Sequence, residues 1–410
     1  MIYKKIIKII NKLYIFFRDL LFLVFLAFIS KKNYEISQRK EILLVSDFVS
    51  KRSKRFLLIS KNLKKYGWQI SLLKLKSDDE FEEDVFTRID SYKTNNEAIY
   101  KIFKNHSSKL IFFVSNGNFD LALKSVHFFG TKIIYDPLDI WPGNLNELNA
   151  NKIQKKLALK QRKIIKKVSN IVCRDIQLSA LGKKIRKDKN LIYFSDYLDS
   201  ENFKSIEDEN FSKQGPYKFV SIGNINTMDY LNGKAYFDFI ETLKNENVEF
   251  HFYMHPNHEN NLDSFKNENP YFDENNKKIS IHNFISPDKI IDEIRKYDCG
   301  MILMGDHFYK KYNHGIWNKK LCYKCGSSRI TDYIFANLDI VLVKTEPKNY
   351  LQFFSGRYGN VYDFREISSI DFKSSKVKNK NLTNLLISKQ IKRLDEYLIK
   401  VKRKNDKPFR

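Results

Sequence analysis

Short apolar runs alternate with longer amphipathic stretches along most of this chain. Residues 41–46, 110–114 and 133–135 are continuous or nearly continuous runs of aliphatic and aromatic side chains. Short apolar runs bounded by polar turns are typical of strands buried on both faces of a parallel sheet. Helical spacing in residues 56–66 and 119–129 predicts crossover helices between these strands. The pattern therefore predicts right-handed βαβ units and a parallel sheet.

The same alternation starts again after a break in the middle of the chain. Residues 200–216 lose all periodicity and contain an acidic triplet and a Gly-Pro pair, which is typical of a linker. Strands are predicted again at 217–222, 248–254, 279–284 and 299–304, with helices between them. Two successive runs of this kind predict an α/β fold, with two Rossmann-like domains that face each other across a cleft.

These patterns give the expected domain organisation. An N-terminal Rossmann-like domain is expected at 40–205, a linker at 206–216 and a C-terminal Rossmann-like domain at 217–370. Residues 77–108 are mixed and charged, and we expect helices there. A basic amphipathic helix is predicted within 376–405.

Residues 1–32 predict a membrane-associated helix. Lys4, Lys8 and Lys12 share one helical face, and residues 13–29 are apolar apart from one Arg-Asp pair. The uninterrupted apolar part is shorter than the ~20 residues that a spanning helix needs. We therefore expect peripheral or single-helix attachment at the cytoplasmic face of the inner membrane. A secretory signal and a buried domain helix are the alternatives.

Composition narrows the partners but does not identify one. The 410 residues carry a formal charge of +25, which favours an anionic partner such as a membrane surface or a phosphorylated substrate. No zinc-finger, RNP-like or helix-turn-helix pattern is present, so nucleic acid is not expected. Cys173 and Cys299 lie in apolar runs and are expected to be buried thiols. Cys322 and Cys325 form a lone CxxC pair without the further ligands of a zinc site, and no metal is expected.

The candidate chemistry centres on residues 327–338. Ser327 and Ser328 are positioned to cap a helix start, and a helix start attracts anions such as diphosphate. Arg329 lies in the first turn, and Asp332 follows one turn in, where a carboxylate can hold a ribose. The sequence therefore predicts a nucleotide-diphosphate site at this helix start.

Other candidates follow predicted strands, where open α/β sheets bind their ligands. Asp136 and Asp139 follow the strand at 133–135 and are candidates to orient or deprotonate an acceptor hydroxyl; a turn stabilised by Asp side chains is the alternative. Gly223 ends a strand where backbone can approach a ligand closely. His314 lies in the long polar loop before the 327–338 helix and is a further catalytic candidate.

Two segments resemble glycosyltransferases of the GT-B fold, and most closely the retaining family 4-like group that builds bacterial surface polysaccharides. The segment from His282 to Asp298 is similar to the family's "H-G-(V/F)" stretch and its following helix. The segment from Ser328 to Val341 is similar to the family's "K-(L/I)-x-E-Y" helix and strand. By this resemblance Arg329 takes the place of the basic residue, and Asp332 that of the glutamate that binds the donor ribose. Lys324 stands where the family's E-x7-E pattern has its first glutamate, so that carboxylate is missing.

The resemblance implies a metal-independent glycosyltransferase with no cofactor beyond a nucleotide-sugar co-substrate. Phe284 and Ile285 would contact the base, and Lys234 would help Arg329 to neutralise the departing diphosphate. The implied acceptor is a lipid-linked or surface-polysaccharide sugar. The His255-Pro256 pair is also found in phospho-alditol transferases, so that class is an alternative. A nucleotide-sugar epimerase on the same fold is another alternative. A non-catalytic binder explained by charge alone is the remaining class.

Overall fold

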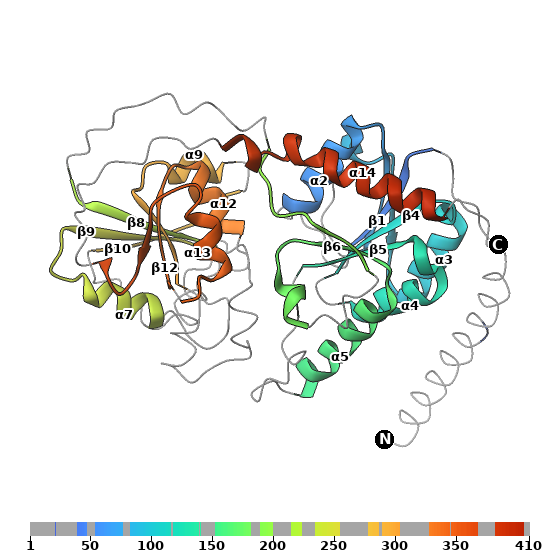
Figure 1. Ribbon diagram of the computed structural model, residues 1–410, viewed down its shortest axis with the longest axis horizontal. Helices are drawn as coiled ribbons and strands as arrows, with labels where there is room; N and C mark the ends of the chain where they lie inside the picture. The colour runs from blue at the N-terminus through green and yellow to red at the C-terminus, as the bar shows by residue number, and fades with distance from the viewer. Residues whose placement is uncertain are drawn as a thin grey trace, which may run out of the picture.

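The computed structural model describes residues 21, 39–46, 54–76, 83–115, 118–138, 140, 152–181, 189–199, 215–223, 234–254, 278–286, 289–303, 328–344, 346–367 and 382–405. These residues form two α/β lobes that lie side by side (Figure 1). We call residues 39–199 together with 387–405 the first lobe, and residues 215–367 the second lobe.

The first lobe is built on a parallel sheet of seven strands in the order β3-β2-β1-β4-β5-β6-β7. Residues pair in parallel register throughout, as in Leu44 with Leu72 on one side and with Phe112 on the other. The central strands are fully buried because helices cover both faces. The strands are β1 (Glu41–Ser46), β2 (Gln69–Leu75), β3 (Arg88–Tyr92), β4 (Leu110–Ser115), β5 (Ile133–Pro137), β6 (Asn170–Cys173) and β7 (Asn190–Tyr193).

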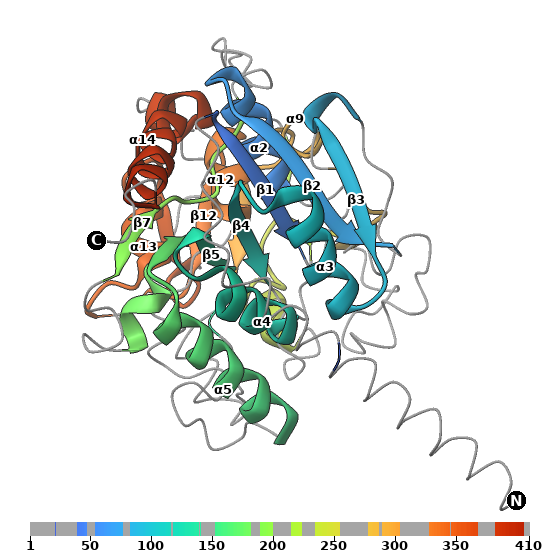
Figure 2. The same cartoon turned by 90° about the vertical axis from the view of Figure 1, so that its right-hand side faces the viewer.

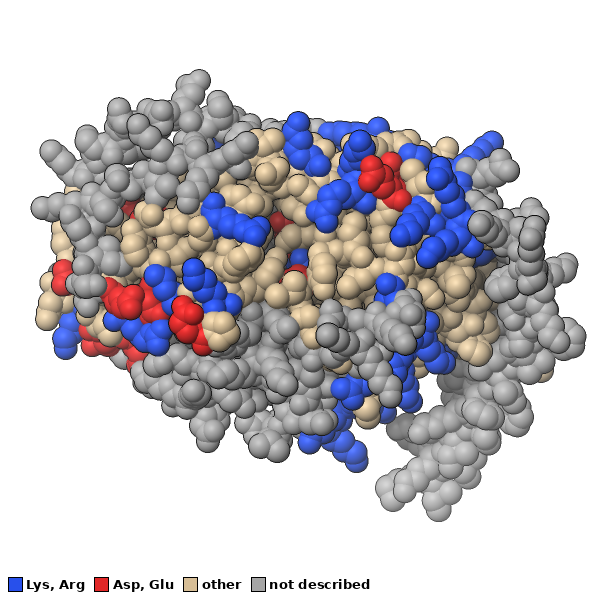
Figure 3. Space-filling model, viewed as in Figure 1, with Lys and Arg blue, Asp and Glu red and all other residues tan. Residues whose placement is uncertain are grey.

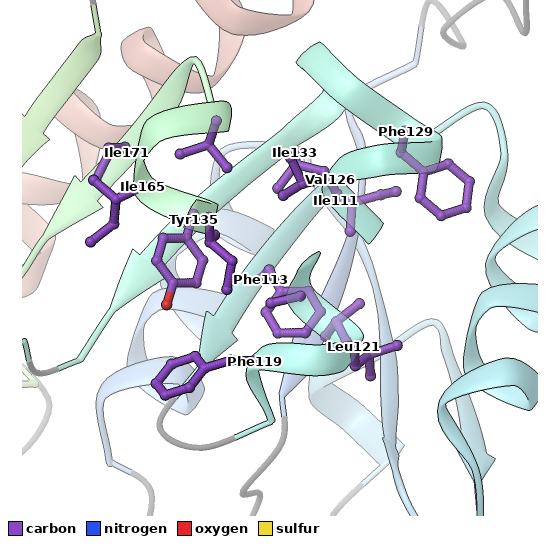
Figure 4. Packing of buried hydrophobic residues seen from close by; sticks show 14 of the residues in the cluster. Ile111, Phe113, Phe119, Leu121, Val126, Phe129, Ile133, Tyr135, Ile165 and Ile171 are labelled. Atoms are coloured by element: carbon purple, nitrogen blue, oxygen red, sulfur yellow. The ribbon is translucent and has the colours of Figure 1, made fainter. Parts of the chain in front are cut away.

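Helices α3 (Asn95–His106), α4 (Phe119–Phe129) and α5 (Lys152–Lys167) cover one face of this sheet (Figure 2). Phe113 and Tyr135 of the sheet pack with Phe119 of α4 and Ile165 of α5 in one apolar cluster (Figure 4). Helices α2 (Lys54–Lys65) and α14 (Ile387–Asn405) cover the opposite face.

The second lobe repeats the same plan with six parallel strands in the order β10-β9-β8-β11-β12-β13. Helices α9 (Ile290–Ile294), α12 (Ser328–Phe335) and α13 (Tyr350–Ser355) pack on one face, and α7 (Lys234–Thr242) packs on the other. The strands are β8 (Tyr217–Ile222), β9 (Val248–Tyr253), β10 (Ile279–His282), β11 (Cys299–Ile302), β12 (Asp339–Leu342) and β13 (Val361–Asp363).

The chain crosses back from the second lobe to the first through α14. Leu198, which follows β7, forms a parallel bridge with Leu386 just before this helix. The apolar side of α14 then packs against α2, and its buried Asp395 accepts hydrogen bonds from Trp68 at 2.7 Å and Lys40 at 3.0 Å. Helix α14 is therefore part of the first lobe's core, although it follows the second lobe in sequence (Figure 1).

The structure confirms the α/β class and the two parallel sheets, and it corrects details of the sequence prediction. Residues 77–108 were expected to be helical, but they contain the edge strand β3 as well as α3. The helix expected between the strands at 279–284 and 299–304 is the short α9, Ile290–Ile294. Cys173 and Cys299 are buried thiols, as expected. The predicted helix in 1–32 lies outside the described residues except for Leu21. Within the described ranges, no helix is both long enough and apolar enough to cross a membrane.

Asp339 lies at the start of β12, at the sheet edge opposite the carboxyl ends of the strands. Burial raises the pKa of Asp339 to about 6, and hydrogen bonds from Asn360, Tyr217 and Tyr362 limit that rise. The folded pKa therefore lies above the value of about 3.9 in an unfolded chain. The native state binds this proton more tightly, so its stabilising contribution is present at low pH and is lost as pH rises through 6.

We expect Asp339→Asn to remove this pH dependence. In the unaltered protein this group should lower the free energy of unfolding by about 2–3 kcal/mol as pH rises from about 4 to about 7. Urea unfolding at several pH values measures the effect as the difference between the two proteins. Asp120→Asn, at a carboxylate that is 56% exposed, is the control and should leave the profile unchanged. Parallel profiles for Asp339→Asn and the unaltered protein would contradict the assignment.

Candidate functional site

Helix α12 contains most of the segment predicted to bind the nucleotide. It lies between the second sheet and the first lobe. Its apolar residues Ile330, Tyr333 and Ile334 are buried against the sheet. Asn337 ends the helix with a left-handed φ of 55°, a conformation that Asn tolerates better than most residues. Thr331, on another side of the helix, donates a hydrogen bond to the backbone oxygen of Asp196 in the first lobe at 3.3 Å. The helix therefore contacts both lobes.

The carboxyl end of β8 brings Gly223 next to the first turn of α12. Gly223 has a φ of 77°, a region that L side chains rarely adopt. A Cβ atom at this glycine would lie 3.9 Å from Nε of Arg329. The structure thus brings together two predicted donor-binding residues that are far apart in sequence. Asp332 lies in the following turn and is 9% exposed.

Tyr333 fixes the height of α12 above the sheet. Its hydroxyl accepts a hydrogen bond from the Ile222 amide at 3.2 Å and donates one to the Met301 oxygen at 3.3 Å, so it bridges β8 and β11. The Tyr333 ring covers Gly300, where an added Cβ atom would lie 2.4 Å from ring carbons. The crossovers from β8 and β11 leave in opposite directions across the sheet, and ligands of doubly wound folds bind at such a switch point.

Phe284 and Ile285 follow β10 and are half-buried, and Ile285 packs on the same cluster as α9 and α12. His282, just before them, stacks on Tyr253 with ring centroids 4.6 Å apart. Its Nε2 lies 2.9 Å from Nδ1 of His251, and burial lowers the pKa of His251 to about 4. These paired rings are therefore part of the hydrogen-bonded framework of the second lobe.

A buried ion cluster holds the segment that crosses between the lobes. Arg55, at the start of α2, lies 3.0 Å from Asp136 of β5 and 3.1 Å from Asp196, and it donates a hydrogen bond to the Ser195 oxygen at 2.9 Å. Burial alone would lower the pKa of Arg55, but the two carboxylates outweigh it and the pKa is raised. Figure 3 shows recessed basic and acidic atoms in the hollow between the lobes.

This cluster corrects the role expected for Asp136. Its side chain is 0% exposed and is paired with Arg55. Burial raises the pKa of Asp136, and the Arg55 guanidinium opposes that rise. A carboxylate enclosed in this way does not meet an acceptor hydroxyl. The side chain of Asp136 therefore forms a buried ion pair, which is neither the acceptor contact nor the Asp-stabilised turn that the sequence suggested.

A small hollow with an internal volume of about 10 Å³ opens beside this cluster at the ends of β5 and β6. It is lined by Pro137, Leu138, Ile140, Cys173, Arg174, Asp175, Gln177 and Leu178. Gln177 accepts a hydrogen bond from the Ile140 amide at 3.1 Å and donates one to Asp175 at 3.0 Å, which joins the two strand ends. This volume has room for about one water molecule, so the hollow does not enclose a substrate.

Several predicted site residues have no described side chain. Asp139, His314 and Ser327 lie outside the described residues. Ser328 starts α12 and Lys234 starts α7, but their side chains are not described. No cluster of His, Cys, Asp or Glu suited to a metal occurs among the residues that are described.

Sequence reasoning missed the residues that join the lobes. Tyr350 at the start of α13 shares a hydrogen bond with Ser195, and burial raises the pKa of its hydroxyl to about 12. Arg55 and Thr331 also belong to this group. The signal that could have directed attention to Arg55 is its position in the first turn of α2, directly before the apolar residues 56–59.

No protein family and no curated protein match this sequence. Solved structures do match it along most of its length. A glycosyltransferase from Rickettsia africae ESF-5 aligns with a TM-score of 0.52 at 11% identity, covering 89% of this chain and 99% of that one. The catalytic domain of starch synthase IV from Arabidopsis thaliana, bound to ADP and acarbose, aligns with a TM-score of 0.53 at 7% identity, covering 89% and 100%.

Anabaena HepE in complex with UDP and glucose gives a TM-score of 0.52 at 8% identity, covering 90% of this chain and 98% of that one. Identities this low show the fold alone. The chain therefore has the two-lobed α/β architecture of these glycosyltransferases, which is the GT-B fold.

We expect Gly300→Ala to destabilise the second lobe by about 1–3 kcal/mol, because the new methyl group collides with the Tyr333 ring and shifts α12. Urea unfolding measures the loss. Gly359→Ala is a matched control, since its Cβ atom would make only an ordinary contact at 3.8 Å with the Leu338 oxygen. Equal stability of the two variants would show that Tyr333 does not rest on Gly300.

We expect Arg55→Ala to lower the free energy of unfolding by about 3–5 kcal/mol, because it leaves two carboxylates without the cation that they share. The matched control is Arg88→Ala, which removes an arginine that is 49% exposed from its pair with Asp90. That change should cost about 1 kcal/mol or less. Chemical denaturation of both variants measures the loss of unfolding free energy. Similar losses would mean that the buried cluster stabilises the protein no more than an exposed ion pair does.

Proposed function

We propose that this protein is a metal-independent glycosyltransferase. It takes a sugar from a nucleotide-sugar donor and transfers it to a lipid-linked or surface-polysaccharide acceptor at the cytoplasmic face of the inner membrane. One observation carries the proposal. Gly223, the first turn of α12 and Arg329 converge at the strand ends of the second sheet, and such a convergence suits a diphosphate.

The chemistry follows from the charges at this place. Loss of the nucleoside diphosphate leaves negative charge on the leaving oxygens. Fixed positive charge near a leaving group is among the largest catalytic effects, because it needs no reorganisation during the reaction. Arg329 supplies that charge, with Lys234 as a second candidate cation. Ser327 and Ser328 would cap the helix beside the phosphates, and Asp332 would bind the ribose.

The acceptor would approach from the first lobe, beside the hollow at the ends of β5 and β6. Asp139 directly follows that strand end, and His314 belongs to the loop before α12. They are the remaining candidates to orient or deprotonate the acceptor hydroxyl. Phe284 and Ile285 would contact the base of the donor. Closure of the lobes around both substrates would exclude water and suppress hydrolysis of the donor.

Thermal denaturation with UDP, GDP, CDP, ADP and their sugar conjugates tests the donor class. We expect one nucleotide to raise the melting temperature, because it binds only the folded protein. Incubation with the stabilising sugar nucleotide then separates transfer from epimerisation by its products. If no nucleotide stabilises the protein, the proposed function is wrong.

We expect Arg329→Ala to weaken binding of that nucleotide by about 10- to 100-fold, since a charge-assisted contact contributes about 1.5–3 kcal/mol. Isothermal titration measures the affinity. Arg295→Ala is the matched control, because Arg295 is not among the proposed donor-binding residues and pairs with Asp292 at 3.2 Å. Unchanged affinity in Arg329→Ala, with nucleotide still binding the unaltered protein, would remove the site assignment but keep the enzyme class.

A further inference from the structure

Helix α5 has an outer face that the proposed donor site does not use. Its sequence contains seven lysines and one arginine and no acidic residue. The inner side buries Ala158, Gln161, Ile164 and Ile165 against the first sheet and α4. The outer side exposes a set of lysines, namely Lys152, Lys155, Lys156, Lys163, Lys166 and Lys167. This outer side is continuous because these positions cluster on one face at 3.6 residues per turn.

Two large apolar side chains of α5 are exposed, one within this outer side and the other at its flank. Leu159 is 58% exposed and Ile153 is 69% exposed. Leu159 falls in the middle of the lysines, with Lys155 one turn before it and Lys163 one turn after it. Scattered exposed leucines are ordinary on protein surfaces, but Leu159 is flanked on both sides by cations.

The position of α5 leaves this face accessible. The helix lies at the rim of the first lobe, far from α14 on the other side of the sheet (Figures 1 and 2). Basic atoms gather along this rim without acidic atoms among them in the view of Figure 3. Lys160, at the side of the helix, pairs with Asp120 of α4 at 2.6 Å. That ion pair joins α5 to α4 and turns the remaining lysines outward.

We propose that the outer face of α5 docks the first lobe on an anionic membrane surface. Lysines near an anionic leaflet are attracted to its headgroups. Leucine and isoleucine flanked by lysines enter the boundary between headgroups and acyl chains, as the apolar side of an interfacial helix does. A nucleic acid would also attract the lysines, but it offers no apolar layer for Leu159 and Ile153. The observations therefore favour a lipid surface.

This inference deepens the proposed function, because it places the lobe that would receive a lipid-linked acceptor on the bilayer. Its test uses no nucleotide, so its result is separate from that of the donor-binding experiments. The full chain is sedimented with vesicles of phosphatidylcholine alone and of phosphatidylcholine mixed with phosphatidylglycerol.

We expect the triple variant Lys155→Glu, Lys163→Glu, Lys166→Glu to bind the anionic vesicles about tenfold more weakly or worse, because each lysine contributes to the attraction. The matched control is Lys389→Glu, Lys392→Glu, Lys400→Glu, which makes the same charge change at exposed positions of α14. It should bind nearly as the unaltered chain does. Equal binding by the two triple variants would overturn the proposal.

A local reporter distinguishes docking by α5 from attachment through any other segment. Leu159→Trp should shift its fluorescence to shorter wavelength with anionic vesicles, whereas Lys392→Trp on α14 should not. Neither phosphatidylcholine vesicles nor duplex DNA should produce the shift. Absence of the shift with anionic vesicles would refute the docking face, and a shift with DNA alone would identify a nucleic-acid surface instead.

Discussion

The cation of Arg55 holds the segment of the first lobe that contacts the second lobe. This guanidinium is buried and shared between Asp136 and Asp196, and it also binds the Ser195 oxygen. Residues 194–199, which it holds, leave the first sheet and meet the second lobe. Because buried charges are costly without partners, the cluster tolerates few other arrangements of this segment. One local ion cluster therefore fixes the part of the first lobe that α12 contacts.

The contacts across the seam between the lobes are individually weak. Thr331 donates one hydrogen bond to Asp196 at 3.3 Å, and the Leu198–Leu386 bridge adds a short backbone contact. A single hydrogen bond contributes about 1 kcal/mol, far less than the burial that holds each sheet together. Leu198 adds an apolar contact, because it is buried in the same cluster as Ile330 and Ile334 of α12.

The sequence predicted elements where local pattern decides the structure and failed where distant partners decide it. Buried strands such as β4 are continuous apolar runs and were found with their approximate bounds. Strand β3 was missed because Arg88–Tyr92 is polar and lies at the sheet edge, where only pairing with β2 makes it a strand. Asp136 was expected to be catalytic because it follows a strand. Its pairing with Arg55 was missed because the two residues are 81 positions apart in the sequence. The helix of Arg329 was predicted, but its contact with Gly223 depends on the sheet order.

Both lobes have a switch point in their sheet, but different side chains occupy the space beside it. In each sheet the first strand of the lobe lies between the second strand and a later one: β1 between β2 and β4, and β8 between β9 and β11. This order creates a switch point beside the first strand. In the first lobe, the Arg55 side chain fills the space at the end of β5 and neutralises Asp136. In the second lobe, β8 ends in a glycine with no side chain, and the nearby Arg329 is half exposed. A ligand that carries two phosphates needs an approachable backbone and an accessible cation. Only the second switch point combines these among the described residues, which supports the proposal that the donor binds that lobe.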